Sequence, residues 1–188
     1  MTTIIPAATI TAITGATAQT DIDLQGNAII QMLEAYLGVI LVKRDILNEK
    51  ITLPYCGRVF QTDYLPINSV SKLELLQKDG TYKEYTTPLA LGMSSIEFLE
   101  PSFLHHHGVE AGKIAYIRLS YNAGYFSSWT EFPPILQEAA LELLKYLYAS
   151  ELKAGFQSEH LGDYSYTKGN IVHGLPVEIA SMLDRVIL

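Results

Sequence analysis

The chain has 188 residues, of which 48% are hydrophobic and 18% are charged, a balance typical of a folded protein with one well-buried core. Its net charge of −7, with 13 scattered Lys and Arg residues, argues against attractive binding to the phosphates of nucleic acid. The longest apolar run, residues 35–42, is far shorter than the roughly 18 residues that span a bilayer, so no membrane association is expected.

An uncharged segment precedes the first long helix. Residues 1–20 are rich in Thr, Ala and Ile, and we expect them to form an N-terminal arm, or a short first element, that packs on another surface. Apolar residues then recur at helical spacing over residues 21–37, and Gly38 can end the helix in a left-handed conformation. The following apolar run, residues 39–42, predicts a short strand.

The pattern of residues 43–121 predicts β structure. Short apolar or alternating runs are bounded there by Pro, Gly and other turn residues, which is typical of antiparallel strands. Asp79 and Gly80 predict a tight hairpin, because such turns need residues that tolerate positive φ. The predicted strands cover residues 51–53, 58–60, 72–75, 82–86, 96–98 and 113–121.

Two more helices are predicted in the C-terminal third. Pro133 and Pro134 can begin a long amphipathic helix, which Lys153 and Gly155 would end. A last helix is predicted to begin at Pro176. Its inward-facing apolar residues would be Val177, Ile179, Leu183 and Val186.

Together these elements predict an α+β fold. It would be a small bundle of about three to four helices, with an antiparallel β insertion between the early helix and the long third helix. We expect the insertion over about residues 50–121, within a single domain of residues 21–188 that follows the arm of residues 1–20.

The strongest metal signal is a run of three histidines, His105, His106 and His107. Neighbouring side chains point apart and cannot all reach one tetrahedral ion, so a solvated turn is the favoured interpretation. The alternative is a metal-dependent hydrolase in which His105 and His107 bind the ion and His160 and Asp163 add ligands. Metal analysis of the purified protein separates the two interpretations.

Cys56 is the single cysteine, which excludes an internal disulfide bond and suits a protein made in a reducing cytoplasm. Without a Cys-His signature, we interpret it as a small buried hydrophobic residue and not as a nucleophile. The chain also lacks the GxSxG, HExxH, GxGxxG and P-loop motifs. We therefore expect no enzyme activity, and no catalytic, metal or cofactor site.

Residues 156–174 lack apolar periodicity and predict a long loop, which in a compact domain is usually functional. Within it, Asp163, Tyr164, Ser165 and Tyr166 combine rigid aromatic rings with small polar groups, which is typical of an adaptable recognition surface. The alternative is that these tyrosines pack onto the chain's own helices. We predict that the four residues contact another protein or another copy of the chain.

Several segments follow one another in a recognisable order. They are residues 30–38 at the end of the early helix, 64–70 entering a strand, Asp79 with Gly80, 121–125 before Pro133, 158–166, and Leu175 with Pro176 at the last helix. In this order and spacing, over about residues 21–188, the chain resembles the head-tail connector (adaptor or head-completion) proteins of tailed double-stranded DNA bacteriophages.

The resemblance implies a structural virion protein that forms a ring, commonly twelvefold, beneath the portal in the neck. The ring would extend the DNA channel and dock the stopper or tail. Expected partners are further copies, the portal protein and the stopper or tail protein, while double-stranded DNA passes an acidic wall without specific binding. Portal contact is expected from residues 1–20, from residues 156–174, or from the last helix, in which Leu183 and Val186 are candidate residues for contact with a partner or another copy. A stopper or tail-completion protein of the same neck is the second interpretation.

Overall fold

The computed structural model describes residues 2–54, 58–77, 79–99, 114–152, 158–161, 164–167, 171–172 and 174–186. Within these ranges the chain forms four α-helices and several antiparallel sheets, which confirms the predicted α+β fold. It divides into two compact units: a helical unit, Met1–Gly38 with Phe126–Leu188, and a β unit, Val39–Tyr125. The β unit extends at both ends beyond the insertion that was expected over residues 50–121.

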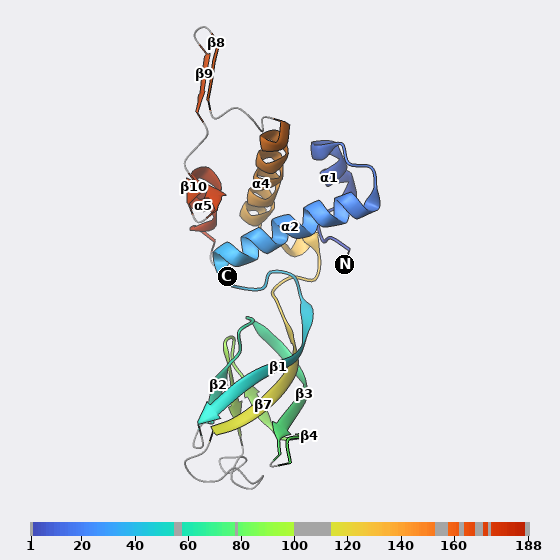
Figure 1. The fold of residues 1–188 in the computed structure, drawn as a ribbon, viewed down its shortest axis with the longest axis vertical. Helices are drawn as coiled ribbons and strands as arrows, with labels where there is room; N and C mark the ends of the chain where they lie inside the picture. Colours follow the sequence, from blue (N-terminus) through green and yellow to red (C-terminus); the bar gives the residue numbers. More distant parts are fainter. Residues whose placement is uncertain are drawn as a thin grey trace. The chain divides into compact units, whose positions relative to one another are not determined.

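The helical unit contains α1 (Ala7–Thr14), α2 (Gln19–Leu37), α4 (Pro134–Leu152) and α5 (Val177–Leu183), with a short 3-10 helix, η1 (Trp129–Glu131), before α4 (Figure 1). Helix α1 packs against α2 and α4, α2 packs against α4, and α4 packs against α5. Two predicted helix ends are confirmed, because Gly38 follows α2 with φ of +68° and Pro134 is the first residue of α4. The helices share an apolar core that includes Ile10, Ile22, Ile29, Ile30, Leu33, Leu136, Ala139, Leu143, Leu144, Ile179 and Leu183.

The N-terminal segment, which was expected to pack on another surface, contains the short helix α1 and packs on helices of its own unit. Ile5 and Ile10 are 1% and 0% exposed, so the uncharged, Ile-rich sequence is covered within the chain itself. The backbone N–H of Thr3 donates a hydrogen bond to Oδ1 of Asp23 on α2, at 3.1 Å. Gly26, on the same helix, has no Cβ and therefore allows Thr3 to approach closely.

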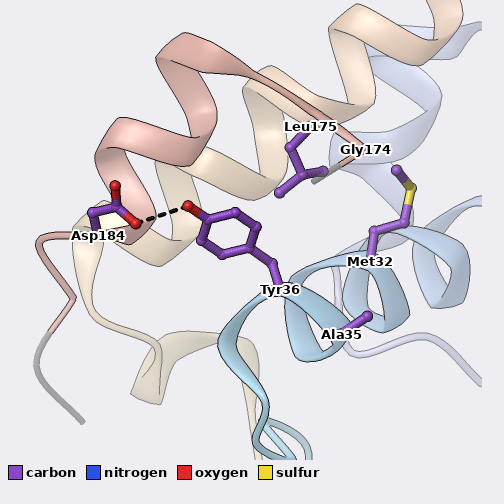
Figure 2. Close-up of a pocket in the computed structure, with 6 residues that line it drawn as sticks. All are labelled: Met32, Ala35, Tyr36, Gly174, Leu175 and Asp184. Atoms are coloured by element: carbon purple, nitrogen blue, oxygen red, sulfur yellow. Dashed lines mark hydrogen bonds between the residues drawn. The ribbon is translucent and has the colours of Figure 1, made fainter. Parts of the chain in front are cut away.

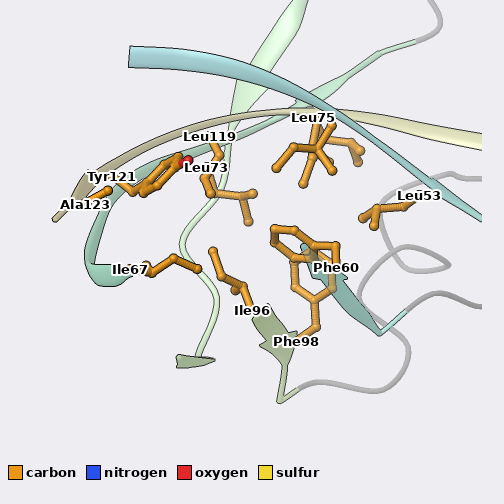
Figure 3. Packing of buried hydrophobic residues seen from close by; sticks show 12 residues of the cluster. Leu53, Phe60, Ile67, Leu73, Leu75, Ile96, Phe98, Leu119, Tyr121 and Ala123 are labelled. Carbon is orange, nitrogen blue, oxygen red and sulfur yellow. The ribbon is translucent and has the colours of Figure 1, made fainter. Parts of the chain in front are cut away.

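Two antiparallel sheets form the β unit (Figure 1). The larger has the strand order β1-β7-β3-β4 and the smaller β2-β6-β5. The strands are β1 (Arg44–Pro54), β2 (Val59–Gln61), β3 (Ile67–Leu76), β4 (Tyr82–Glu84), β5 (Leu89–Leu91), β6 (Ser95–Phe98) and β7 (Ile114–Ala123). Apolar residues of both sheets meet in one core (Figure 3), formed by Ile51, Leu53, Phe60, Ile67, Leu73, Leu75, Ile96, Phe98, Ile117, Leu119, Tyr121 and Ala123.

Each of the six strands predicted within residues 43–121 has a counterpart in the structure, and β5 is an additional one. Strand β5 consists of three apolar residues, Leu-Ala-Leu, and so shows no alternation of apolar and polar residues. The predicted hairpin at Gly80 is present, and the φ of this residue is +85°. The turn is wider than two residues, because the last paired residues are Leu76 and Tyr82.

Residues 39–42 were predicted to form a strand, but the structure has an irregular segment there with one bridge at Val42. Ile40 and Leu41 are 5% and 0% exposed, so their apolar character reflects burial of the segment. The N–H of Ile40 donates to the carbonyl of Leu65 at 2.8 Å. A short apolar run does not by itself distinguish a strand from a buried connection.

The segment between α4 and α5 contains strands where a loop was predicted. β8 (Ser158–Leu161) pairs with β9 (Tyr164–Thr167), and β10 (Ile171–Val172) pairs with β11 (Leu175–Pro176). The loop prediction is wrong for these residues. It was based on the lack of apolar periodicity, which arises only where one face of an element is buried, whereas a two-stranded hairpin is defined by its backbone hydrogen bonds. Lys153 and Gly155, which were predicted to end the long helix, lie outside the described residues.

Candidate assembly surface

The predicted contact residues belong to two elements of the helical unit. Tyr164, Ser165 and Tyr166 lie on β9, while Asp163 lies outside the described residues. Leu183 is 1% exposed at the end of α5, and Val186 follows this helix and is half-buried. Leu183 is therefore a core residue of the chain, and contact of Leu183 or Val186 with a partner stays a prediction.

The β8–β9 hairpin distributes its residues over two faces. Its register pairs Ser158 with Thr167, Glu159 with Tyr166, His160 with Ser165, and Leu161 with Tyr164. Directly paired residues share a face, and successive residues of a strand alternate between faces. One face therefore carries the positions of Glu159, Leu161, Tyr164 and Tyr166, and Ser165 belongs to the opposite face.

A pocket of about 490 Å³ lies between α2 and the C-terminal part of the helical unit (Figure 2). It is lined by Met32, Ala35, Tyr36, Gly174, Leu175 and Asp184. At one side the hydroxyl of Tyr36 donates a hydrogen bond to Oδ1 of Asp184 at 2.7 Å. This bond to a carboxylate, together with burial, raises the pKa of Tyr36 above its usual value. We refer to this pocket as the α2–α5 groove.

The outward side of α2 is uncharged beside the groove. Leu24 is 72% exposed, and Ala28, Gln31 and Ala35 are also exposed. These four residues are three or four positions apart, which places them on one face of the helix. A solvent-facing helix normally carries charged residues on such a face. Since Ala35 also lines the groove, this uncharged face continues into it.

The net charge of the chain belongs entirely to the helical unit. Its two segments, Met1–Gly38 and Phe126–Leu188, contain 11 of the 20 Asp and Glu residues but only 4 of the 13 Lys and Arg residues. The β unit holds the remaining nine acidic and nine basic residues, so its formal charge is zero. The first segment contributes three acids, Asp21, Asp23 and Glu34, of which Glu34 is 8% exposed. The net charge is therefore −3 in the first segment and −4 in the second, and α2 carries no charged residue between Asp23 and Glu34.

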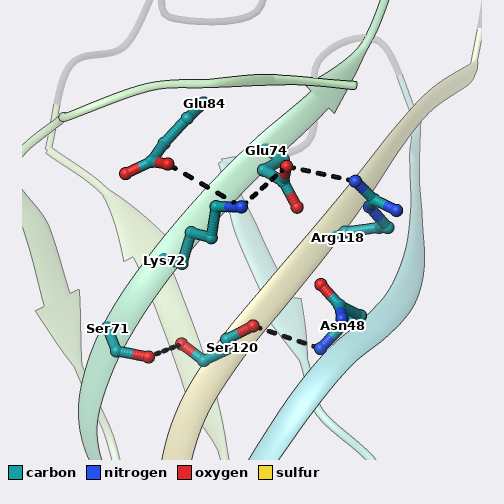
Figure 4. Close-up of polar contacts among 7 residues, drawn as sticks. All are labelled: Asn48, Ser71, Lys72, Glu74, Glu84, Arg118 and Ser120. Atoms are coloured by element: carbon teal, nitrogen blue, oxygen red, sulfur yellow. Dashed lines mark hydrogen bonds and ion pairs between the residues drawn. The ribbon is translucent and has the colours of Figure 1, made fainter. Parts of the chain in front are cut away.

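The polar side of the larger β sheet holds a charged network that contributes to stability (Figure 4). Glu74 is 5% exposed and lies 3.0 Å from Nζ of Lys72 and 3.1 Å from Nη2 of Arg118. The guanidinium of Arg118 also lies over the ring of Tyr82, 3.8 Å from its centroid. Burial alone would raise the pKa of Glu74, but hydrogen bonds from Lys72 and Arg118 hold this pKa below its usual 4.5.

Replacing Glu74 with glutamine is expected to lower the free energy of unfolding at pH 7 by about 1–2 kcal/mol, because Lys72 and Arg118 lose the negative charge that they share. A depressed pKa stabilises the fold fully above the unfolded-state pKa, and the contribution is lost as the pH falls through the folded-state value. The difference between wild type and Glu74→Gln should thus be constant above about pH 5.5 and shrink below pH 4.5. Urea unfolding across this range measures it; a difference independent of pH contradicts the assignment.

The described residues contain no group of three or more His, Cys, Asp or Glu residues placed to hold a metal ion. The predicted histidine run, His105 to His107, lies outside these residues, as do Asp163 and Cys56, while His160 is on β8. Metal content of the purified protein therefore still tests the hydrolase interpretation, which a stoichiometric ion would support. Among the helices that the structure describes, none is long and apolar enough to cross a bilayer.

Comparison with known proteins reveals similarity in structure. No protein-family model matches the sequence, and no curated protein is similar to it in sequence. A chain in the neck of an empty gene transfer agent particle, computed with C6 symmetry, is similar with a TM-score of 0.63 and 15% identity, over 97% of this chain and 88% of that chain. A chain in the virion of the native gene transfer agent particle has a TM-score of 0.60 and 16% identity, over 97% and 88% of the two chains.

A third similar chain comes from the neck of the native gene transfer agent particle, computed with C12 symmetry. It has a TM-score of 0.55 and 16% identity, over 99% of this chain and 94% of that chain. At 15–16% identity, what the similarity shows is the fold, and it does so over nearly the whole chain. The shared fold includes both the helical and the β unit, since 97–99% of the chain is covered.

Proposed function

We propose that this chain is a structural protein in the neck of a phage-like particle, where it forms a ring and acts as the head-to-tail adaptor. The proposal rests on the fold shared, over 97–99% of the chain, with chains from particle necks computed with C6 and C12 symmetry. Such symmetry arises when unlike patches of identical subunits meet head to tail and the rotation closes. The partners of this ring are the portal protein above it and the stopper or tail protein below it.

The charge distribution supports this role. A helical unit that carries the whole −7 repels the phosphates of a passing duplex, so DNA can cross a ring of such units without being held. The same charge makes neighbouring copies repel each other wherever acidic surfaces would meet. An uncharged surface avoids this repulsion between copies, and the outward face of α2 offers one.

The mass of the purified full chain, measured alone and with the portal protein, tests the proposal. We expect a closed ring with a defined number of copies, either in solution or on the portal. Binding to the portal distinguishes an adaptor from a stopper, which would bind a neck or tail protein instead. A chain that stays monomeric and ignores the portal would defeat the proposal.

Replacing Tyr164 and Tyr166 together with alanine is expected to weaken assembly by at least about tenfold, because aromatic side chains dominate the energetics of most interfaces. The monomer should keep its far-UV circular dichroism spectrum and its unfolding midpoint, since β8 and β9 pair with each other and with no other strand that the structure describes. Measuring the ring fraction against concentration gives the effect. Assembly equal to that of wild type would show that the hairpin is not a contact.

A further inference from the structure

We infer that the β8–β9 hairpin of one copy docks into the α2–α5 groove of the next copy, through the face that carries Leu161, Tyr164 and Tyr166. This inference rests on the proposed ring and identifies the two surfaces that close it. Each copy then both inserts a hairpin and receives one, so the contact joins unlike patches, as a ring requires.

The hairpin needs a partner to be stable. Within the described part of the chain, β8 and β9 form a sheet of their own that has only two strands. An isolated two-stranded hairpin is at best marginally stable in water and normally needs a third strand or a packing surface. The register places Leu161, Tyr164 and Tyr166 on one face, which is the face that gains most from being covered.

The α2–α5 groove offers a matching surface. Its lining is mixed: Met32, Ala35 and Leu175 contribute apolar groups, and Tyr36 and Asp184 contribute polar ones. Its volume of about 490 Å³ greatly exceeds the roughly 30 Å³ that one water molecule occupies, so it can receive whole side chains. Tyr36 and Asp184 add a hydrogen-bonded polar edge, which suits tyrosines that carry a hydroxyl at the end of an apolar ring.

Charge favours a second copy as the occupant. The uncharged α2 face leads into the groove through Ala35, so a second acidic helical unit can approach there without meeting a row of like charges. The docking face of the hairpin has a single acidic position, Glu159. Arg185 directly follows Asp184, which lines the groove, and is exposed, so it can pair with Glu159 of the next copy.

Disulfide cross-linking between separately labelled chains tests the inference. Cys56→Ser removes the single native cysteine, and two proteins are then made in this background: one with Met32→Cys and a larger, tagged one with Tyr166→Cys. After mixing, assembly and mild oxidation, we expect a covalent dimer of one chain of each kind. The matched control carries Ser165→Cys in place of Tyr166→Cys, on the opposite face of the hairpin, and should give at least about fivefold less product.

A pair of glutamate variants tests the groove without introduced cysteines, in case the cysteine substitutions themselves prevent assembly. Ala35→Glu places a charge in the groove at an exposed position, and we expect it to weaken assembly about as much as the double tyrosine variant. Ala12→Glu, at an exposed position of α1, should leave assembly within about twofold of wild type. Equal weakening by both would overturn the inference.

The remaining outcomes are also decisive. A ring that forms without the mixed covalent dimer overturns the docking of the hairpin but leaves the proposed ring intact. A disulfide formed only within one chain that carries both Met32→Cys and Tyr166→Cys would mean that the hairpin covers its own groove, which also overturns the inference. Failure of the chain to form a ring, alone or on the portal, would remove the proposed function and the docking together.

Discussion

Replacing Gly124 with alanine is expected to lower the free energy of unfolding of the β unit by about 3 kcal/mol. Gly124 has a φ of +119°, a conformation that residues with a side chain rarely adopt. A Cβ placed there would lie 2.8 Å from Cα of Lys43, from its backbone N and from the carbonyl carbon of Val42. These are backbone atoms, which cannot rotate away as the end of a side chain can.

Backbone hydrogen bonds hold the chain in place on both sides of this contact, at residues 124–125 and just before residues 42–43. The N–H of Gly124 donates to the carbonyl of Pro66 at 3.0 Å, and the next N–H, of Tyr125, donates to the carbonyls of Ile40 and Leu41. Relief of the clash therefore requires breaking hydrogen bonds at the point where the chain enters and leaves the β unit. Urea unfolding, followed by circular dichroism, measures the loss.

Gly80→Ala is the matched control for this prediction. Gly80 also has a positive φ, of +85°, but a Cβ there would meet nothing within 4 Å. Its replacement should cost only the conformational strain, about 1 kcal/mol. If the two variants lose the same stability, the contact of Gly124 with the backbone of Lys43 is not the cause.

Replacing Gly26 with alanine is expected to destabilise the helical unit by about 2 kcal/mol, the second largest effect. Alanine in the middle of a helix normally stabilises it by about 1 kcal/mol relative to glycine. Here, however, the added Cβ would lie 2.1 Å from Oγ1 and 2.7 Å from Cβ of Thr3, and 2.9 Å from Cδ1 of Ile10. The clash outweighs the helix propensity, because it displaces the segment that buries Ile5 and Ile10.

A double-mutant cycle isolates this contact. Thr3→Gly removes both clashing atoms of the threonine and leaves only Cδ1 of Ile10, the end of a side chain that can rotate away, so Gly26→Ala in that background should be nearly neutral or stabilising. Thermal unfolding of the four proteins gives the coupling between the two sites. A gain in stability for Gly26→Ala in the wild-type background would show that residues 2–5 do not pack on α2 in solution.

The sequence predicted the elements whose signals are local. Helix α2 has regular apolar spacing and a terminal glycine, Gly38, and α4 begins at a proline, so both were recognised. Residues 1–20 were expected to pack, but the surface that they pack on was not identified, because it depends on Thr3 approaching a glycine more than twenty residues away in the chain. Such close approaches leave no periodic pattern in the sequence.

The candidate assembly surface was predicted only in part. The tyrosines Tyr164 and Tyr166 were chosen for their composition, but composition could not separate them from Ser165, which the register places on the other face. The α2–α5 groove was missed, since its lining comes from residues near 35 and near 180 that meet only in the folded unit. One signal was available, because no charged residue occurs between Asp23 and Glu34.

Locating the chain in intact particles tests the central claim most directly. Purified particles assembled with this protein would be analysed for protein composition and labelled with a gold-tagged antibody for electron microscopy. We expect a fixed, small number of copies per particle, with the label at the junction between head and tail. Particles that mature without the chain, or that carry its label only elsewhere, would contradict a structural role in the neck.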